Sequence, residues 1–421
     1  MKQFFVTTSW DDGSIYDLRL AELLSKYEMP ATFYIPINNP ERKMMKFREI
    51  RAIGDGFEIG GHTENHKVLT GISLKEAKRE ISEGKKMLED IIGREVTSFC
   101  YPKGMYNQDI KQLVGFLGFA YARTVRLFGT QILDKLQAPT SVHAYDHKPV
   151  VYLKELWRPH NALASRGKLR LISKKWDEIA INLLNYCKKI GGTYHLWGHS
   201  WEIEERGDWK KLEKVLSYIS RHTEKDQRKT NGELLSELEK GKKRYYENLD
   251  PTKYKSNMKV LAQLTHDFDK SKMRILDIGC GNGKASELFP RADYIGIDFA
   301  KNFIGYAKRL YPKRKFYLTD FVDINSLGLP KQDLIIIWGM FEDATNPFGE
   351  LEMINNLIKK GTRIIFSLHN NKSLLFKIKK LLQSKLGDIF PYTSFSKEFV
   401  EKKFGVKVEE FGPTLAVIID K

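Results

Sequence analysis

Short apolar segments alternate with amphipathic ones along the N-terminal half of the chain. The apolar segments are rich in β-prone residues and have the length of buried strands, whereas the amphipathic ones follow the period of a helix. We expect strands at Phe4–Thr8, Ala31–Ile35, Phe57–Gly60, Thr97–Tyr101, Phe119–Arg123 and Tyr194–Trp197. We expect helices at Asp17–Tyr27, Leu74–Ile91 and Asp208–Ser220. This alternation predicts a barrel-like β/α domain.

A strongly basic and polar stretch, Gly241–Arg244, interrupts this pattern. Beyond it we expect helical segments at Tyr245–Asn248 and Thr252–Phe268. Further strands are expected at Arg274–Ile278, Tyr294–Asp298, Phe316–Leu318, Asp333–Trp338, Thr362–Leu368, Val406–Phe411 and Leu415–Ile419. Because 421 residues exceed one typical domain, we expect two α/β domains, residues 1–242 and 243–421.

The composition, 42% hydrophobic and 29% charged, is typical of soluble globular proteins. The three cysteines are widely spaced and form no paired motif, which argues against a disulfide framework and against a cysteine zinc site. The chain opens without a hydrophobic leader and has no apolar run long enough to cross a membrane. We therefore expect a cytoplasmic protein.

The formal net charge of +17 favours anionic partners, such as phosphorylated or lipid-linked molecules. The Lys and Arg residues are scattered and form no recognisable nucleic-acid motif, so we do not expect nucleic acid as a partner. One local concentration of positive charge, Arg158–Lys175, could hold a phosphate group. No pattern in the chain indicates its oligomeric state.

Two aspartates and two histidines carry the first candidate chemistry. Asp11 and Asp12 follow the first expected strand, where one carboxylate can bind a metal ion while its neighbour takes a proton from water. His62 and His66 would point to one side if the segment after Phe57–Gly60 is helical. Two imidazoles and one carboxylate suit zinc and leave a coordination position open for water.

With these motifs the chain resembles the polysaccharide deacetylases of carbohydrate esterase family 4, from residue 1 to about residue 240. The resemblance implies a distorted (β/α)7 barrel that removes acetyl groups from acetamido sugars. It implies that Asp11 is the general base. It also implies a metal site formed by Asp12, His62 and His66.

The segment from Phe99 to Gly104 is similar to another motif of this family. The resemblance implies that its backbone N–H at Lys103 stabilises an oxyanion. It implies a substrate-binding wall formed by Tyr101, Pro102 and Gly104. Cys100 stands where the family often has an arginine that orients the base, so either another residue, such as Arg123, does this or Asp11 is tuned differently.

The family's last motif is a strand that ends in a histidine, which fits the segment Gly192–Glu202. We assign His199 as the general acid that protonates the leaving amine, because it stands at the end of this strand. His195, on the same face by alternation, is the second choice.

The second candidate chemistry is the glycine-rich turn in Leu276–Gly283, where a strand runs into a loop that a nucleotide can approach closely, and we expect a helix from Lys284 after this loop. This segment resembles the first motif of class I S-adenosylmethionine-dependent methyltransferases, over about residues 245 to 421. The resemblance implies a Rossmann-like fold with these cofactor-binding residues: Asp277, Gly279, Cys280, Gly281, Gly283, Asp298, Phe299, Asp320, Phe321 and Trp338.

Within that set, Asp298 would hold the ribose hydroxyls, and Asp320 with Phe321 would form the adenine site. Residues that could contact the methyl acceptor follow the later strands; these are Glu342, Asp343, His369 and Asn370, for which helix caps and loop polarity are an equal explanation.

The leading hypothesis is a bifunctional enzyme that N-deacetylates a sugar, glycolipid or nucleotide-sugar precursor and methylates the same or a related molecule. A second hypothesis is another amide hydrolysis on the same metal site, such as removal of a formyl group. A third is a deacetylase fold without turnover that binds glycan for the methyltransferase. Cys100 and Lys103, which depart from the family pattern, keep the third hypothesis open.

Overall fold

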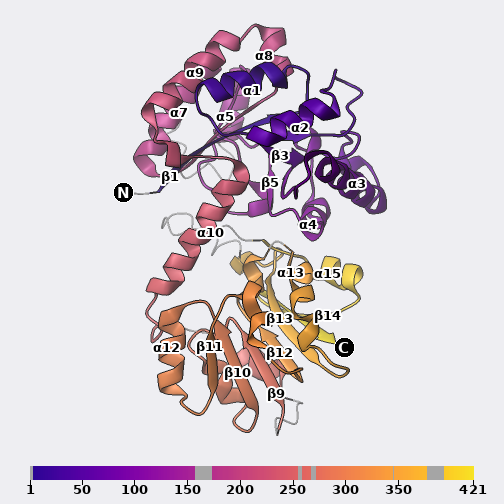
Figure 1. Ribbon diagram of the computed structural model, residues 1–421, viewed down its shortest axis with the longest axis vertical. Helices are drawn as coiled ribbons and strands as arrows, with labels where there is room; N and C mark the ends of the chain where they lie inside the picture. The colour runs from indigo at the N-terminus through magenta and orange to yellow at the C-terminus, as the bar shows by residue number, and fades with distance from the viewer. Residues whose placement is uncertain (1–2, 157–172, 255–257, 267–271, 345, 377–392) are drawn as a thin grey trace. The chain divides into compact units, whose positions relative to one another are not determined.

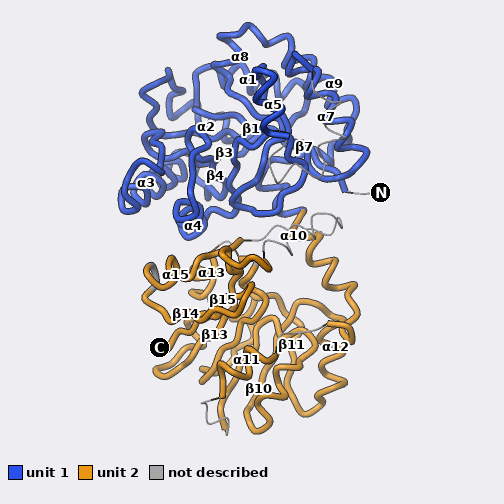
Figure 2. Tube along the Cα trace, turned by 180° about the vertical axis from the view of Figure 1, so that it is seen from behind, with its two compact units in different colours: residues 1–237 blue, residues 238–421 orange. Residues whose placement is uncertain are grey.

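The computed structural model describes residues 3–156, 173–254, 258–266, 272–344, 346–376 and 393–421, so most of the basic segment 158–175 lies outside the described residues (Figure 1). The chain forms two compact units, residues 1–237 and 238–421 (Figure 2). This division falls within helix α10 (Asn231–Asn248). The helix expected at Tyr245–Asn248 is therefore the last part of a longer one that begins before the basic stretch.

Seven strands of the first unit form a parallel sheet in the order β5-β4-β3-β2-β1-β7-β6. They are β1 (Phe4–Asp11), β2 (Thr32–Ile35), β3 (Glu58–Gly61), β4 (Ser98–Cys100), β5 (Tyr121–Arg123), β6 (Val142–His143) and β7 (Gly192–Gly198), and the short β8 (Arg228–Lys229) adds to β1. The segment from Ala138 to Val142 connects the two edges of the sheet: Ala138 forms a bridge with Arg123 of β5, and Val142 of β6 pairs with Leu196 of β7. These contacts curl the sheet into the expected distorted β/α barrel.

Helices pack around this sheet and cover its apolar core (Figure 1). They are α1 (Asp17–Lys26), α2 (Phe47–Gly56), α3 (Leu74–Ile92), α4 (Gln108–Phe116), α5 (Pro149–Leu156), α7 (Trp176–Ile190), α8 (Ser200–Arg206) and α9 (Trp209–His222). Helix α3 begins where the Ser73 hydroxyl accepts a bond from the Glu76 N–H, and it ends at Gly93 with φ 70°. The strands therefore meet at one carboxyl-end edge, where β1, β3 and β7 deliver the candidate site.

The second unit is a mixed sheet in the order β11-β10-β9-β12-β13-β15-β14. Its strands are β9 (Arg274–Ile278), β10 (Asp293–Asp298), β11 (Lys315–Leu318), β12 (Leu334–Ile337), β13 (Arg363–His369), β14 (Lys407–Phe411) and β15 (Thr414–Asp420). Strand β15 pairs antiparallel with both β13 and β14, and the other pairs of neighbouring strands are parallel. This arrangement confirms the expected Rossmann-like fold with its antiparallel ending.

Two expectations for helices of this unit need correction. The described helices are α11 (Met258–Leu264), α12 (Lys301–Leu310), α13 (Pro347–Glu350) and α15 (Lys397–Phe404). The segment after the glycine-rich loop is a 3-10 turn, Lys284–Leu288, and not an α-helix. The helix expected at Thr252–Phe268 is shorter in the described residues, where only α11 is helical.

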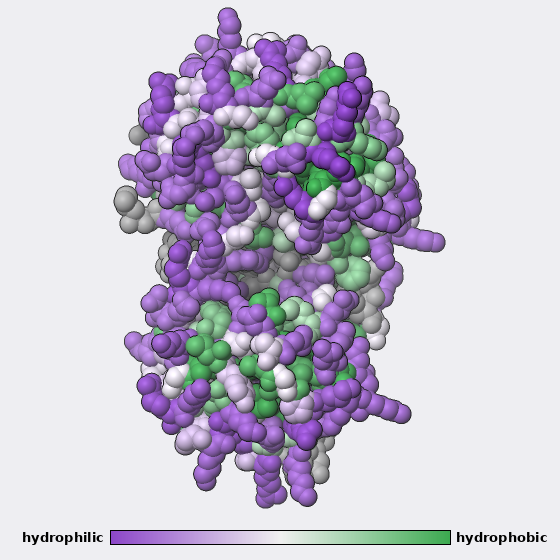
Figure 3. Space-filling model, viewed as in Figure 1, coloured by the Kyte–Doolittle hydropathy of each residue, from purple (hydrophilic) through white to green (hydrophobic). Residues whose placement is uncertain are grey.

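Hydrophilic side chains cover much of the face shown in Figure 3, in line with the charged fraction of 29%. Across the described residues, no helix has both the length and the apolar character needed to cross a bilayer.

Candidate functional site

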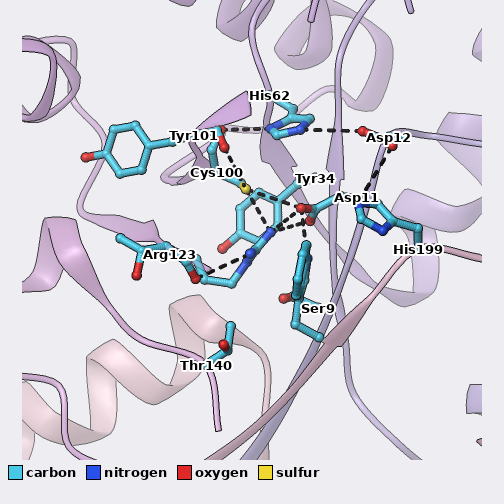
Figure 4. Close-up of polar contacts among 12 residues, drawn as sticks. Ser9, Asp11, Asp12, Tyr34, His62, Cys100, Tyr101, Arg123, Thr140 and His199 are labelled. Carbon is cyan, nitrogen blue, oxygen red and sulfur yellow. Dashed lines mark hydrogen bonds and ion pairs between the residues drawn. The ribbon is translucent and has the colours of Figure 1, made fainter. Parts of the chain in front are cut away.

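Asp11 and Asp12 stand at the carboxyl end of β1 and face different partners (Figure 4). The chain turns sharply between them and the following loop, because Asp12 has a φ of 81° and its N–H donates to the Tyr34 carbonyl at 3.0 Å. Both side chains are almost fully buried. Adjacent positions in the sequence thus place two carboxylates in two separate electrostatic environments.

Asp12 lies against the two predicted histidine ligands. Its Oδ1 atom is 3.1 Å from Nε2 of His66 and 3.6 Å from Nε2 of His62. The helical condition under which these histidines would share a side is not met: residues 62–68 form a loop in which Thr63 and His66 have φ values of 70° and 52°. This strained loop, and not helical spacing, turns both rings toward Asp12.

The hydrogen bonds of this cluster fit a metal ion. His62 Nδ1 lies 2.8 Å from the Cys100 carbonyl, which only accepts, so Nδ1 carries a ring proton and a metal ion would bind the lone pair of Nε2. That lone pair faces Asp12 Oδ1, a buried atom without a hydrogen-bond partner among the described residues. Acceptors that face one another in this way are held together by a proton or by a metal ion, and two imidazoles with one carboxylate suit zinc.

An indole also contacts this cluster. Trp201 Nε1 donates to Asp12 Oδ2 at 2.8 Å, so the second carboxylate oxygen is already satisfied. Burial raises the pKa of Asp12, but positive charge held between Asp12 and the imidazoles of His62 and His66, whether protons or a metal ion, outweighs it and keeps this pKa well below its ordinary value. Asp12 therefore offers one free ionised oxygen, Oδ1, to a metal ion.

Asp11 is paired with a buried arginine. Arg123 Nη2 contacts both oxygens of Asp11, at 2.5 Å for Oδ1, and the Trp197 indole donates to Oδ2 at 2.8 Å. Burial raises the pKa of Asp11, yet the Arg123 charge outweighs it and lowers this pKa below its ordinary value. Of the two possibilities left open by Cys100, the geometry favours Arg123 as the residue that orients Asp11, and Cys100 Sγ lies in the same contact network.

A second cluster, Asp11 with His62 and Cys100, also has the spacing of metal ligands. Here the carboxylate already has a permanent cation, because Arg123 remains protonated. Burial raises the pKa of the Cys100 thiol well above its ordinary value, so this sulfur is a neutral thiol and a poor ligand. The Asp12 cluster is the better metal site.

His199 lies beside the carboxylates at the end of β7. Its Nε2 is 3.8 Å from Asp12 Oδ2, and its Nδ1 is 3.3 Å from Glu202 Oε2. Burial lowers the pKa of His199, but Glu202 and the two aspartates outweigh it and raise this pKa above its ordinary value. A histidine that keeps its proton more firmly suits a general acid.

The second choice, His195, is placed differently. Its Nε2 is 2.8 Å from the Ser9 hydroxyl, and the residue is buried and does not line the cavity. Burial lowers the pKa of His195 to about 3, which leaves the ring neutral. It has the character of a core histidine.

The predicted oxyanion segment is a tight turn, Pro102–Gly104, with Lys103 at φ 55°. Gly104 and Met105 donate the backbone bonds of this turn, at 2.8 and 3.1 Å. Lys103 and Gly104 line the cavity, and the Lys103 ammonium pairs with Glu41 at 2.7 Å. The other two predicted wall residues lie behind the lining, since Tyr101 is fully buried with its hydroxyl on the Leu136 carbonyl at 2.8 Å, and Pro102 is buried as well.

These residues surround a cavity of about 440 Å³. Further lining residues were not anticipated from the sequence: Glu41, Arg42, Val125, Leu127, His143, Tyr145, His147, Val151, Glu155 and Trp201. Most of them come from loops or from the two-residue strand β6, which carry no periodic signal. The sequence signal that could have indicated this wall is the group of histidine and aromatic residues within 143–147.

The second unit has a smaller cavity, of about 90 Å³, beside its glycine-rich loop. Five of the predicted cofactor residues line it, namely Gly279, Gly281, Asp298, Phe299 and Trp338. Gly281 has a φ of 53°, and a Cβ atom there would lie 3.4 Å from the Tyr254 ring. Asp298 accepts the backbone N–H groups of Gly281 and Ala300, both at 2.9 Å, so it is held at the cavity wall. This backbone cradle fits a nucleoside cofactor.

The remaining predicted cofactor residues lie behind or beside the lining. Asp277 and Cys280 are buried, and Asp277 bonds the Tyr294 hydroxyl. Gly283 packs toward the Phe316 ring. Two more have other partners: the Asp320 carboxylate pairs with Lys243, and Phe321 packs edge-on against Phe341.

Lys242, Tyr246 and Tyr254 also line this cavity and were missed, because they precede the recognisable motif. Among the candidates for acceptor contact, His369 Nδ1 lies 3.5 Å from Glu342 Oε2. Asn370 is buried, with its amide on the Gly412 carbonyl at 3.1 Å, which is a structural role.

Comparison with known proteins identifies both units. Residues 1–122 match the family model described as polysaccharide deacetylase, and residues 269–403 match the model described as methyltransferase domain. The chain therefore carries a polysaccharide deacetylase domain at its N-terminal end and a methyltransferase domain at its C-terminal end.

Relatives of each part are distant. The peptidoglycan-N-acetylmuramic acid deacetylase PdaC of Bacillus subtilis is 28% identical over 113 residues, which is 26% of this chain and 23% of that protein. The malonyl-[acyl-carrier protein] O-methyltransferase of Priestia megaterium is 27% identical over 117 residues, which is 27% of this chain and 42% of that protein. The match thus spans less than half of either relative. A solved methyltransferase from Archaeoglobus fulgidus covers 39% of this chain and 95% of its own, with 20% identity and a TM-score of 0.32.

Proposed function

We propose that the chain is a metal-dependent N-deacetylase of an acetamido sugar joined to an S-adenosylmethionine-dependent methyltransferase that acts on the same or a related molecule. The sugar would be part of a glycan, glycolipid or nucleotide-sugar precursor. The deacetylases among the relatives, which act on peptidoglycan by name, support an N-acetylated substrate. The charge of +17 supports a phosphorylated or lipid-linked form.

One observation carries the hydrolase half: a buried carboxylate oxygen of Asp12, with no hydrogen-bond partner among the described residues, faces the Nε2 atoms of His62 and His66. These three residues would hold the metal, with zinc the best match to the donor set. When bound, such an ion polarises an acyl oxygen and lowers the pKa of water.

The side chains around this site can then divide the proton transfers of amide hydrolysis. Asp11, held ionised by Arg123, accepts a proton from the attacking water. The backbone N–H of Lys103 is available to the oxygen that becomes negative. His199 gives its proton to the leaving nitrogen as the C–N bond breaks, so that acetamide and water become acetate and an amine.

Incubation of the zinc-loaded chain with a panel of N-acetylated oligosaccharides and sugar nucleotides tests this half. We expect acetate release, and we expect Asp11→Asn to lower its rate at least about a hundredfold while zinc binding stays intact. No acetate from any member of the panel would contradict the proposal and favour a binding role. N-formylated sugars in the same panel separate deformylation from deacetylation.

In the second unit, S-adenosylmethionine supplies an already activated methyl group, so the protein mainly positions cofactor and acceptor. Asp298 and the Gly279–Gly281 backbone would bind the nucleoside part. Calorimetric titration of the full chain with the cofactor tests this assignment. Asp298→Ala should weaken binding at least about tenfold, and an unchanged affinity would exclude Asp298 from the site.

A further inference from the structure

The barrel cavity has a wall that the proposed hydrolysis does not use. Strand β6 and the segment after it place His143, Tyr145 and His147 along this wall. His143 is in register with Trp197 of β7, and their ring centroids are 4.4 Å apart. The wall therefore lies next to the strand that carries His199 and has access to the same substrate.

Its two histidines belong to one hydrogen-bond chain that starts in the protein interior. Thr140 Oγ1 is 3.0 Å from the Arg126 carbonyl oxygen and 3.1 Å from His143 Nε2. The Arg126 carbonyl can only accept, so the single hydroxyl hydrogen of Thr140 donates to it. Thr140 Oγ1 must then accept, and His143 carries its hydrogen on Nε2.

The chain continues from the buried ring to the cavity. Burial, and then the neighbouring His147, hold the pKa of His143 well below its ordinary value, so this ring is neutral and its Nδ1 accepts. His147 Nε2 lies 2.8 Å from that Nδ1 and donates to it. Burial also lowers the pKa of His147, so its ring is neutral and has a lone pair on Nδ1.

The Arg126 carbonyl thus sets the direction of every hydrogen bond in this series, and the last acceptor of the series is Nδ1 of His147. His147 Nδ1 has no hydrogen-bond partner within the described residues, and the residue is only partly buried where it lines the cavity. The main chain of His147 is fixed, because its N–H donates to the Tyr152 hydroxyl at 3.0 Å. An acceptor held in this way is preorganised for a donor that enters the cavity.

We propose that His147 Nδ1 is the acceptor of a substrate subsite that binds a hydroxyl group of the sugar. The proposal rests on the deacetylase function above, because Asp11, Asp12 and His199 line the same cavity. A sugar hydroxyl donates to this nitrogen, whereas a phosphate or carboxylate offers only acceptors and is disfavoured here. His147 is therefore a specificity residue that recognises the ring beside the acyl group.

The tautomers can be measured without any substrate. In the full chain with ¹⁵N-labelled histidine, we expect His143 and His147 to be neutral, with the hydrogen on Nε2 and an unprotonated Nδ1. His143→Gln and His147→Asn assign the signals, and His222→Asn is the matched control, since His222 stacks on Tyr218 at the surface. A hydrogen on Nδ1 of His147 would mean that this nitrogen is a donor and not an acceptor. That result would overturn the proposal, whether or not the enzyme deacetylates.

Binding of N-acetylglucosamine tetrasaccharide to the zinc-loaded chain tests the ligand. His147→Phe removes the acceptor and should raise the dissociation constant about fivefold or more, with zinc affinity unchanged. His147→Asn, whose amide oxygen can replace Nδ1, should bind more tightly than the Phe variant. With a turned-over substrate the Phe variant should raise KM more than it lowers kcat.

Equal binding by the Phe variant and the unchanged chain would overturn the subsite. If the unchanged chain does not bind the tetrasaccharide at all, the sugar-hydroxyl assignment fails. The acetate assay then separates that outcome from failure of the deacetylase function, because it covers other acyl sugars.

Discussion

Asp11 and Asp12 are neighbours in sequence, but their charges are balanced by different means. Asp11 is paired with the guanidinium of Arg123, whereas Asp12 faces two imidazoles and needs a further cation. A charge that is fully buried costs several kcal/mol unless it is paired. The pairing of Asp11 is therefore as much a folding requirement as a catalytic one.

A double-mutant cycle separates these two roles. Arg123→Met leaves the Asp11 carboxylate buried without its partner, and we expect it to lower the free energy of unfolding by about 3–5 kcal/mol. In Asp11→Asn/Arg123→Met the buried charge is gone, so most of this loss should be recovered although hydrolysis stays absent. Urea unfolding of the four proteins measures the cycle, and additive losses would show that Arg123 does not balance Asp11.

Asp277 gives the second unit a pH-dependent stability. Burial raises the pKa of Asp277 to about 7, against 3.8 for the free group, so the folded chain binds a proton that the unfolded chain releases. This stability is fully present below pH 4 or so and is lost as the pH rises through about 7. This pKa shift corresponds to a change of about 4 kcal/mol in the free energy of unfolding between these two pH values.

Asp277→Asn keeps the shape and the bond with the Tyr294 hydroxyl but cannot ionise. The thermal transition of the second unit should therefore fall less steeply from pH 4.5 to pH 7.5 in the variant than in the unchanged chain. Equal slopes, measured by calorimetry, would mean that this carboxyl does not titrate in that range.

Helix α3 holds the loop that carries the two histidine ligands. The carbonyl of buried Glu80 accepts the Glu64 N–H at 2.8 Å, and its carboxylate accepts the Asn65 N–H at 2.9 Å. Gly84, one turn further, lets the helix approach so closely that a Cβ atom there would lie 2.6 Å from the Thr63 carbonyl carbon. The helix thus supports the positive φ values of the loop by contact with its backbone.

Gly84→Ala tests this support. Alanine favours a helix by about 1 kcal/mol, but the clash with loop backbone should outweigh it and destabilise the first unit by about 1–3 kcal/mol. Because the loop must shift, zinc affinity should fall about tenfold or more. Gly56→Ala at the end of α2, where a Cβ atom meets nothing within 4 Å, is the control and should leave zinc affinity unchanged. Equal zinc affinities would refute the role of α3.

The sequence predicted those parts that depend on local pattern. The strands β1 to β5 and β7 of the first sheet, all strands of the second sheet and the Asp12, His62 and His66 cluster follow from apolar runs and short motifs. The loop conformation of the histidines could not be predicted, because positive φ values at Thr63 and His66 depend on contacts with the distant α3. The cavity wall at β6 was missed for a similar reason, since a two-residue strand has no period of its own.

At the scale of the whole molecule, the chain has separate apolar cores. One core lies wholly within residues 4–219, and the others lie within residues 260–418. Helix α10 passes without interruption across the division after residue 237. Each core can therefore respond to its own ligand, while one continuous helix joins the two units.

Ligand-linked unfolding tests this independence. A ligand that binds only the folded state stabilises its own unit by about 2.7 kcal/mol at a hundred times its dissociation constant. Calorimetry of the full chain should show two transitions, of which zinc raises only one and S-adenosylmethionine only the other. Asp12→Asn should abolish the response to zinc alone, and Asp298→Ala the response to the cofactor alone. A single transition that both ligands raise would show instead that α10 couples the two units into one cooperative fold, so that neither could unfold without the other.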